Sequence, residues 1–295
     1  MIKRIFISLA LLLLSLIGLM FWRGEHMALA YIKAQTQMQD YETLYNLLQP
    51  EMILRLPEEA NSKSGPFPLF IQLHGCGGMS LDQHGSYAQL ANEAGYAALI
   101  VSSNAPRGYD RDRSRAEICQ GKALLGQERA ADILIALDYA STRPEIDVRR
   151  ITLAGWSHGA WTIMDYLSLE KEARLPAGLA GYQGPRPEIQ AAVLFYPYCG
   201  RGTRTRLYGW GQSPAVITFM GTGDSVVDYT QCEKNFMQLA NHQGVEIEKH
   251  LYEGAEHAFD HAHLPARIAH WYDADKSTDA RAKLAAFLRD GAVGP

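Results

Sequence analysis

The first chemical signal in the sequence is the pentapeptide G-W-S-H-G at positions 155–159, which matches the pattern G-x-S-x-G. In a nucleophile elbow, this pattern places a serine on a tight turn between a buried strand and a helix, and its glycines let neighbouring backbone come close. The flanking residues agree, because Arg150 to Ala154 are typical of a buried strand and Ala160 to Leu169 predict a helix. Ser157 is therefore the candidate nucleophile.

A serine hydroxyl is a weak nucleophile at neutral pH, so it needs a general base and a carboxylate that orients the base. Downstream of an elbow the partners come in the order Asp or Glu, then His. Asp224 follows an expected strand in the stretch G-T-G-D-S-V-V, and His257 follows the next expected strand in G-A-E-H-A-F. We expect His257 to be the base and Asp224 to hold it.

Both assignments have rivals in the same region of the sequence. Asp228 is a second acid four residues after Asp224, and Asp224 itself could serve only as a turn former in a glycine-rich loop. His257 competes with three other histidines, which are His250, His261 and His263. The order of the motifs favours Ser157, Asp224 and His257.

The stretch H-G-C-G-G at positions 74–78 is the candidate for an oxyanion hole, in which backbone N–H groups bind the charge of a tetrahedral intermediate. One amide is expected from His158, the residue after the nucleophile, and the other from the early loop, where Cys76 has the best position. The imidazoles of His74 and His158 are interpreted as structural or as part of the pocket wall. Neither stands at the position of the base.

Two aromatic residues beside the predicted site are candidates for substrate binding. Trp156 precedes the nucleophile, and Tyr196 ends an expected strand, so we expect both to line the pocket. Tyr109 and Trp210 lie on irregular segments that could cover it. Packing in the core or at the surface is the alternative for all four residues.

From residue 51 onward, apolar strands alternate with helical stretches, which predicts an α/β fold with a mainly parallel central sheet and helices on both faces. Strands are expected at Met52–Leu56, Leu69–Leu73, Tyr96–Val101, Arg150–Ala154, Ala191–Tyr196, Ala215–Met220 and Val245–Tyr252. Helices are expected at Tyr87–Ala94, Gln127–Ser141, Ala160–Leu169, Thr230–Asn241 and Ala280–Leu288. Residues 51–295 are therefore predicted to form one catalytic domain, preceded by a helical connector at residues 31–50.

Residues 1–30 are predicted to be a signal peptide or an N-terminal membrane anchor. Two basic residues precede an uncharged apolar run from Ile5 to Trp22, which as a helix would extend roughly 27 Å, close to the ~30 Å hydrocarbon core of a bilayer. A cleavage motif, A-L-A at positions 28–30, follows the run, so removal and retention remain alternatives, and a buried core helix is a third. Removal or retention would each place the globular part outside the cytoplasm, in the periplasm.

Charge and cysteine content set further limits. The formal net charge of −4 and the absence of a clustered basic stripe argue against a nucleic-acid partner. The four cysteines, Cys76, Cys119, Cys199 and Cys232, show no zinc-like spacing, and an even number in an exported chain predicts disulfides with three alternative connectivities. Four free thiols in a cytosolic protein are the alternative.

From about Phe67 to Phe259 the sequence resembles the dienelactone hydrolase family of α/β hydrolases, through L-H-G-C-G-G, G-W-S-H-G, M-G-T-G-D-S-V-V and G-A-E-H-A-F. The namesake enzymes of the family have cysteine as nucleophile, whereas this chain has Ser157, which favours a general carboxylic-ester hydrolase. The chain is similar to exported relatives with cysteines at matching positions. That resemblance implies that Cys199 pairs with Cys232 and Cys76 with Cys119.

The sequence therefore predicts a serine hydrolase of the α/β-hydrolase fold that cleaves a small-molecule carboxylic ester through an acyl-enzyme. No metal or cofactor is expected. A peptidase of the prolyl-oligopeptidase type shares this catalytic layout but usually carries a large propeller domain, for which the chain has no room. A non-catalytic, membrane-tethered binding protein with the same fold is the other alternative.

Overall fold

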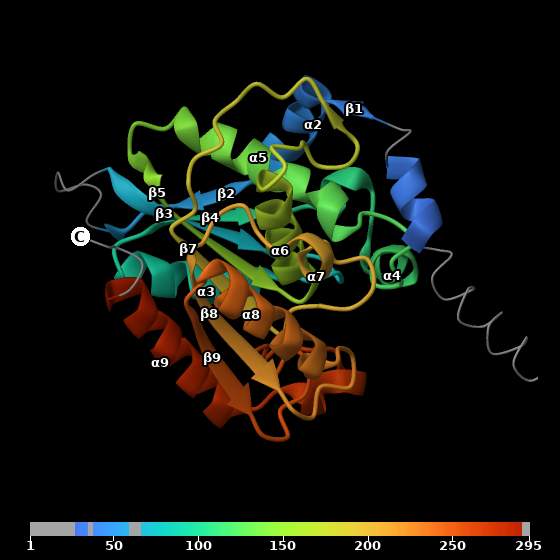
Figure 1. Ribbon diagram of the computed structural model, residues 1–295. Coiled ribbons are helices and arrows are strands. Elements are labelled where there is room, and N and C mark those ends of the chain that lie inside the picture. The colour runs from blue at the N-terminus through green and yellow to red at the C-terminus, as the bar shows by residue number, and fades with distance from the viewer. Residues whose placement is uncertain (1–26, 35–37, 59–65, 291–295) are drawn as a thin grey trace, which may run out of the picture.

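The computed structural model describes residues 27–34, 38–58 and 66–290 of the chain, and a central sheet organises them (Figure 1). Within these ranges the sheet has seven strands in the order β2-β4-β3-β5-β7-β8-β9. All neighbouring strands run parallel except β2, which pairs antiparallel with β4. The strands are β2 (Ile53–Arg55), β3 (Phe67–Leu73), β4 (Ala97–Val101), β5 (Ile146–Trp156), β7 (Ala191–Phe195), β8 (Ala215–Gly221) and β9 (Ile247–Tyr252).

Helices cover both faces of this sheet (Figure 1). One apolar core contains side chains of α2 (Tyr41–Leu48), α5 (Gly126–Ser141), α6 (His158–Glu170) and α8 (Tyr229–Gln243), and the core on the other face contains those of α3 (Leu81–Glu93) and α9 (Ala274–Asp290). Every residue of β3 and β4 is buried, as expected for parallel strands between two helical layers. The predicted fold class is confirmed.

The carboxyl ends of the central strands meet at one edge of the sheet. Leu73 of β3 is opposite Gly155 of β5, and Phe195 of β7 is opposite both Trp156 of β5 and Phe219 of β8. Because the strands are parallel, the segments that follow them leave the sheet on the same side. In open α/β sheets this edge is where ligands bind, so the fold brings the candidate motifs together here.

The region before β2 is not the single helix expected from residue 31 to residue 49. Residues 27–34 are helical and α2 follows them. Asp40 precedes α2 in an extended conformation, and its side chain accepts the Thr43 N–H at 3.1 Å. Such a cap fixes a new helix start. Asp40 also belongs to β1 (Gln39–Asp40), which pairs with β6 (Leu179–Ala180).

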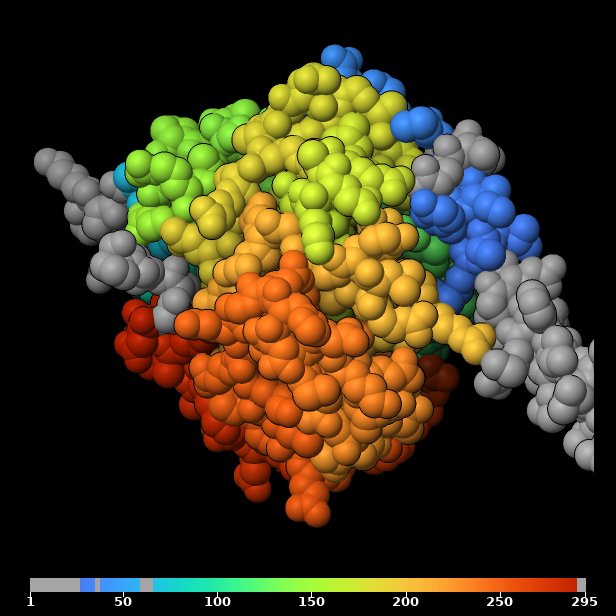
Figure 2. Space-filling model, in the orientation of Figure 1, coloured from blue at the N-terminus to red at the C-terminus, as the bar shows by residue number. Residues whose placement is uncertain are grey.

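The helical residues 27–34 lie at the side of the molecule, where they appear in blue in the space-filling view (Figure 2). Ala30 is buried there in a small apolar cluster with Leu125 and with Trp161 of α6. The apolar run from Ile5 to Trp22 lies outside the described residues. Among the described residues, no helix is both long and apolar enough to cross a membrane.

Candidate active site

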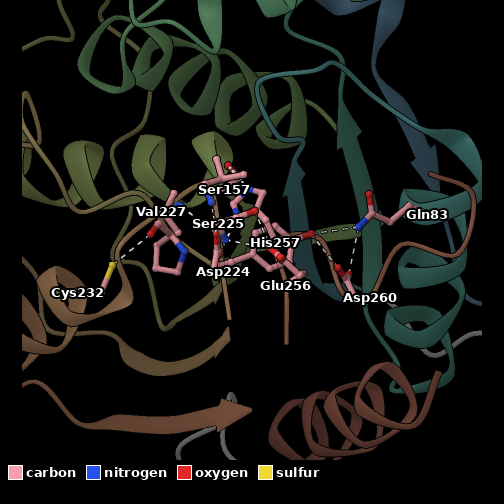
Figure 3. A network of polar contacts seen from close by, with 12 residues as sticks. Gln83, Ser157, Asp224, Ser225, Val227, Cys232, Glu256, His257 and Asp260 are labelled. Atoms are coloured by element: carbon pink, nitrogen blue, oxygen red, sulfur yellow. Dashed lines mark hydrogen bonds and ion pairs between the residues drawn. The ribbon is translucent and has the colours of Figure 1, made fainter. Parts of the chain in front are cut away.

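His257 lies within hydrogen-bond distance of both Ser157 and Asp224 (Figure 3). The Nε2 atom of His257 is 2.9 Å from Oγ of Ser157, and its Nδ1 atom is 2.7 Å from Oδ2 of Asp224. In the neutral tautomer that suits these contacts, Nδ1–H donates to the carboxylate and Nε2 accepts the serine O–H. The side chains of His257 and Asp224 are only 9% and 1% exposed, so little water competes for this chain of hydrogen bonds.

The elbow around Ser157 depends on its two glycines. Ser157 has φ 53° and ψ −110°, a strained conformation for a residue with a side chain. A Cβ atom at Gly159 would stand 2.0 Å from the carbonyl oxygen of Leu73, and one at Gly155 would stand 2.5 Å from the nitrogen of Ala160. Only glycine fits at either position. The turn leaves Ser157 partly exposed between buried neighbours.

The loop that carries Asp224 is fixed by hydrogen bonds within itself and to the histidine loop. Oδ1 of Asp224 accepts the N–H groups of Val226 at 2.8 Å and Val227 at 2.9 Å, which leaves Oδ2 for His257. Ser225 donates its N–H and its O–H to Glu256, the residue before His257, at 3.0 and 2.8 Å (Figure 3). The acid loop and the histidine loop therefore hold each other in register.

The structure places two of the rival residues elsewhere. Asp228 is exposed and caps α8, because its side chain accepts the N–H of Thr230 at 3.0 Å. His250 lies on β9, and its Nε2 atom is 2.6 Å from Oε1 of Glu248. Neither contact involves Ser157.

The peptide between Gly75 and Cys76 is oriented by its own carbonyl group. The oxygen of Gly75 accepts hydrogen bonds from Nδ1 of His74 at 2.6 Å and from the N–H of Gly78 at 3.2 Å. Because a peptide unit is planar and trans, the N–H of Cys76 must point the opposite way. The carbonyl of Cys76 is held in turn by Nδ2 of Asn104 at 2.9 Å.

This loop lies against the elbow. A Cβ atom at Gly75 would stand 3.7 Å from the Cβ of Ser157. His158 is the first residue of α6, and the first amides of a helix have no partner within the helix. The amides of Cys76 and His158 thus belong to two segments that meet beside Ser157.

Arg129, from α5, connects these two segments by hydrogen bonds. Its Nη1 atom donates to the carbonyl oxygen of His74 at 2.7 Å and to Nδ1 of His158 at 3.0 Å, and its Nε atom donates to Ser103 at 2.8 Å. Burial lowers the pKa of Arg129 to about 10. Burial and the Arg129 charge hold the pKa values of His74 and His158 well below the usual range. Both imidazoles are therefore neutral, and their hydrogen bonds fix their orientation.

Two disulfides are present, and both adjoin the site. Cys76, in the early loop, is bonded to Cys119, and Cys232, in α8 after the acid loop, is bonded to Cys199 after β7. These are the pairs that the resemblance implies. They indicate an oxidising compartment outside the cytoplasm.

Trp156 and Tyr196 do not face an open pocket, contrary to the expectation that they line it. Their exposed fractions are 1% and 3%, and both side chains donate hydrogen bonds to the buried carboxylate of Asp260, at 3.0 and 2.7 Å. Successive strand residues point to opposite faces, so Trp156 enters the α3/α9 layer together with Ala154. Tyr196 has φ 36°, which ends the strand alternation and turns its ring under His257, at a centroid distance of 4.6 Å.

A groove of about 620 Å³ begins at the acid loop and continues along α8. Its walls come from the segment after β7, from the residues directly after Asp224, and from one side of α8: Tyr198, Cys199, Gly200, Arg201, Arg206, Val226, Val227, Asp228, Gln231, Lys234, Asn235 and Gln238. In the part of the chain that the structure describes, no group of three His, Cys, Asp or Glu side chains is placed to hold a metal ion.

Comparison with known proteins identifies the family. The family model for the dienelactone hydrolase family matches residues 57–291, which is most of the chain. The chain belongs to the dienelactone hydrolase family. As a member of this family it is a carboxylic-ester hydrolase, and its departure from the namesake enzymes is the serine at position 157. No curated protein sequence is significantly similar to it.

Solved structures of two esterases and of a dienelactone hydrolase-like phosphotriesterase share the fold. A carboxylesterase from Lactobacillus plantarum matches with a TM-score of 0.60 and 16% identity, over 83% of this chain and 93% of that one. A dienelactone hydrolase-like promiscuous phosphotriesterase from metagenomic libraries matches with a TM-score of 0.59 and 18% identity, over 80% and 97%. A propionate-bound esterase from Thermogutta terrifontis matches with a TM-score of 0.56 and 15% identity, over 83% and 90%. At these identities the likeness establishes the fold alone.

Two residues of this dienelactone hydrolase family member were missed by the sequence analysis. Arg129 lies inside an expected helix, and Asp260 lies three residues after His257. Both are charged residues that the fold buries almost completely, and charged side chains are rarely buried without specific partners. Their spacing offers no signal, because the groups that surround them come from distant parts of the chain.

Proposed function

We propose that the chain is a serine esterase in which Ser157, His257 and Asp224 form a catalytic triad and the reaction proceeds through an acyl-enzyme. The observation that carries this proposal is the position of His257, 2.9 Å from the serine hydroxyl and 2.7 Å from the carboxylate. These are the distances that proton transfer from serine to an oriented base requires. Family membership supports the same class of reaction.

In the proposed acylation step, Oγ of Ser157 attacks the ester carbonyl carbon while Nε2 of His257 takes the hydroxyl proton. The carbonyl oxygen becomes an oxyanion, which the amides of Cys76 and His158 bind. The bond to the alcohol oxygen then breaks, and His257 returns the proton to that oxygen. The alcohol departs, and the acyl group remains on Ser157.

Deacylation repeats these steps with water as the nucleophile. Water attacks the acyl carbon and gives a proton to Nε2 of His257, and the same two amides bind the second oxyanion. Collapse of the intermediate releases a carboxylic acid, and the proton returns to Oγ of Ser157. Throughout, Asp224 stabilises the imidazolium and keeps Nδ1 protonated.

A panel of p-nitrophenyl esters from acetate to longer chains, tested on the purified full-length chain, examines this function. We expect turnover of the esters, no turnover of matched peptide p-nitroanilides, and loss of ester turnover in Ser157→Ala. The peptidase alternative predicts that the matched peptide p-nitroanilides are cleaved as well. The binding-protein alternative predicts that neither substrate is cleaved and that a fluorophosphonate probe does not label the chain.

We also propose that the chain is exported and that residues 1–30 serve as a signal peptide or as a membrane anchor. The basic start, the apolar run from Ile5 to Trp22 and the two disulfides support export. The buried position of Ala30 supports retention, because cleavage after Ala30 would remove that residue from its contacts with Leu125 and Trp161. Intact mass of the native protein, measured with membrane fractionation, distinguishes the two forms.

A further inference from the structure

Asp260 is a buried carboxylate with four side-chain hydrogen-bond donors. Its Oδ2 atom accepts from Tyr87 at 2.8 Å, from Trp156 at 3.0 Å and from Gln83 at 3.1 Å, and its Oδ1 atom accepts from Tyr196 at 2.7 Å. All four donors are neutral groups, and Asp260 is 6% exposed. A buried carboxylate is costly unless its oxygens are satisfied, and here both are.

The donors connect the elements that carry the proposed triad. Trp156 ends β5 and directly precedes Ser157, while Tyr196 follows β7 and packs its ring against His257 at a centroid distance of 4.6 Å. Asp260 itself lies three residues after His257, on the same loop. In Figure 3, Asp260 and Gln83 lie on the side of His257 away from Val227 and Cys232. One carboxylate therefore links the nucleophile strand, the neighbouring strand and the histidine loop.

The same three segments hold strained backbone. Ser157 has φ 53°, Tyr196 has φ 36° and Ala258, the residue after His257, has φ 58°. Residues with side chains keep such conformations only where surrounding contacts over-determine them. The hydrogen bonds to Asp260 are such contacts, because they reach Tyr196 itself and the immediate neighbour of Ser157, and Asp260 is two residues from Ala258.

We propose that Asp260 is a positioning residue of this esterase, which fixes the ring of His257 relative to the hydroxyl of Ser157 through its hydrogen bonds to Tyr196 and Trp156. This inference rests on the proposed function. Asp260 acts only through these side chains and takes no part in proton transfer. Burial and the nearby Asp260 charge raise the pKa of Tyr196 far above its usual range, so its phenol remains a donor at every working pH.

Two tyrosines provide a matched pair for the test. Tyr196→Phe and Tyr87→Phe each delete one phenol that donates to Asp260, at 2.7 and 2.8 Å, and both rings are buried. Tyr196 packs on His257, whereas Tyr87, on α3, packs its ring against Trp156, a contact that phenylalanine keeps. We expect the melting temperature to decrease by a similar amount in both variants, and KM to change little. The kcat for ester hydrolysis should fall about 10- to 100-fold in Tyr196→Phe and at most about 2-fold in Tyr87→Phe. The larger loss is expected because a small displacement of the reacting groups is that costly.

Asp260→Asn is the direct variant, and its kcat should fall at least as far as that of Tyr196→Phe. If kcat in Tyr196→Phe and Tyr87→Phe falls equally, in proportion to the loss of stability, the network is only structural and the proposal is wrong. Ser157→Ala separates this failure from that of the proposed function. Activity lost in Ser157→Ala but kept in Tyr196→Phe overturns the positioning role alone, whereas activity that survives Ser157→Ala overturns both proposals.

Discussion

The Nε2 atom of His257 lies 2.9 Å from the hydroxyl oxygen of Ser157, although the two residues are 100 positions apart in the chain. The contact exists because β5 and β9 end at the same edge of the sheet, where the loop that carries His257 begins. Two strands, β7 and β8, lie between them. It requires a serine in a strained turn and a histidine whose other nitrogen is occupied by Asp224. Each of these requirements gives a separate prediction.

Asp224→Asn should lower kcat about 10³- to 10⁴-fold, because the amide N–H₂ would face Nδ1 of His257 and favour the tautomer whose Nε2 carries the proton. KM for a p-nitrophenyl ester should change little. Asp228→Asn is the control, since Asp228 is exposed and its side chain accepts hydrogen bonds from Thr230 and Gln231 at the start of α8. Steady-state kinetics of the two variants check the assignment, and equal activities in both would show that Asp224 is not the acid.

Removal of the two disulfides should have similar effects on stability and different effects on activity. The bonds close loops of 43 and 33 residues. Chain-entropy arguments give each about 4 kcal/mol of stabilisation at 25 °C. Only Cys76–Cys119 holds the loop whose amide is proposed to bind the oxyanion. We expect kcat to fall about 10-fold or more when Cys76 and Cys119 are both replaced by alanine, and less when Cys199 and Cys232 are.

Denaturant unfolding and ester kinetics on the two double variants, measured well below their melting temperatures, provide the comparison. A larger loss of kcat after removal of Cys199–Cys232 would contradict the role assigned to the early loop.

Gly159→Ala should prevent folding or abolish activity, because its Cβ atom would stand 2.0 Å from the carbonyl oxygen of Leu73, a backbone atom of the central sheet. Gly77→Ala is the matched control on the early loop. No heavy atom lies within 4 Å of a Cβ at Gly77, and its backbone is not in the left-handed region. Soluble yield, circular dichroism and ester turnover should be near normal for Gly77→Ala. A folded, active Gly159→Ala protein would show that the elbow is less tightly packed than described.

His84 should make the fold sensitive to acid. Burial lowers the pKa of His84 to about 4, below the ordinary value of 6.5, so the unfolded chain binds a proton that the folded chain does not. The contribution of this neutral histidine is therefore complete above pH 6.5 and decreases as the pH falls toward 4. Between pH 6.5 and 5 it should decrease by about 1.5 kcal/mol.

His84→Gln isolates this contribution, because glutamine does not titrate. The difference in the free energy of unfolding between wild type and His84→Gln, measured by denaturant titration, should shrink by that amount from pH 6.5 to pH 5. A difference that stays constant with pH would mean that His84 takes up its proton in the fold.

The residues of the proposed triad could be selected from the sequence because each of them belongs to a local motif. The serine lies between glycines after one strand, and the acid and the histidine follow later strands. To expect them close together, it is enough to know that parallel strands end at one edge of the sheet. The sheet was equally accessible, since buried parallel strands are short, continuous apolar runs. The bounds of the helices before β2 were not predicted, because Asp40 is extended although the apolar residues around it recur at helical intervals.

The buried charged residues that contact the site residues could not be predicted in the same way. Arg129 and Asp260 meet partners that are between 26 and 177 residues away in the chain, and in the sequence a buried charge looks like a solvated one. Trp156 was expected at the pocket because it precedes the nucleophile, and Tyr196 because it ends an expected strand. Which face a residue takes at the end of a strand depends on the local backbone, and the φ value of 36° at Tyr196 has no sequence signature.

The role of Ser157 as the nucleophile is tested most directly by the reaction of the full-length protein with a fluorophosphonate probe, followed by mass spectrometric mapping of the modified residue. We expect one adduct, on Oγ of Ser157, and no labelling and no ester hydrolysis in Ser157→Ala. Labelling or ester turnover that persists undiminished in Ser157→Ala would contradict it.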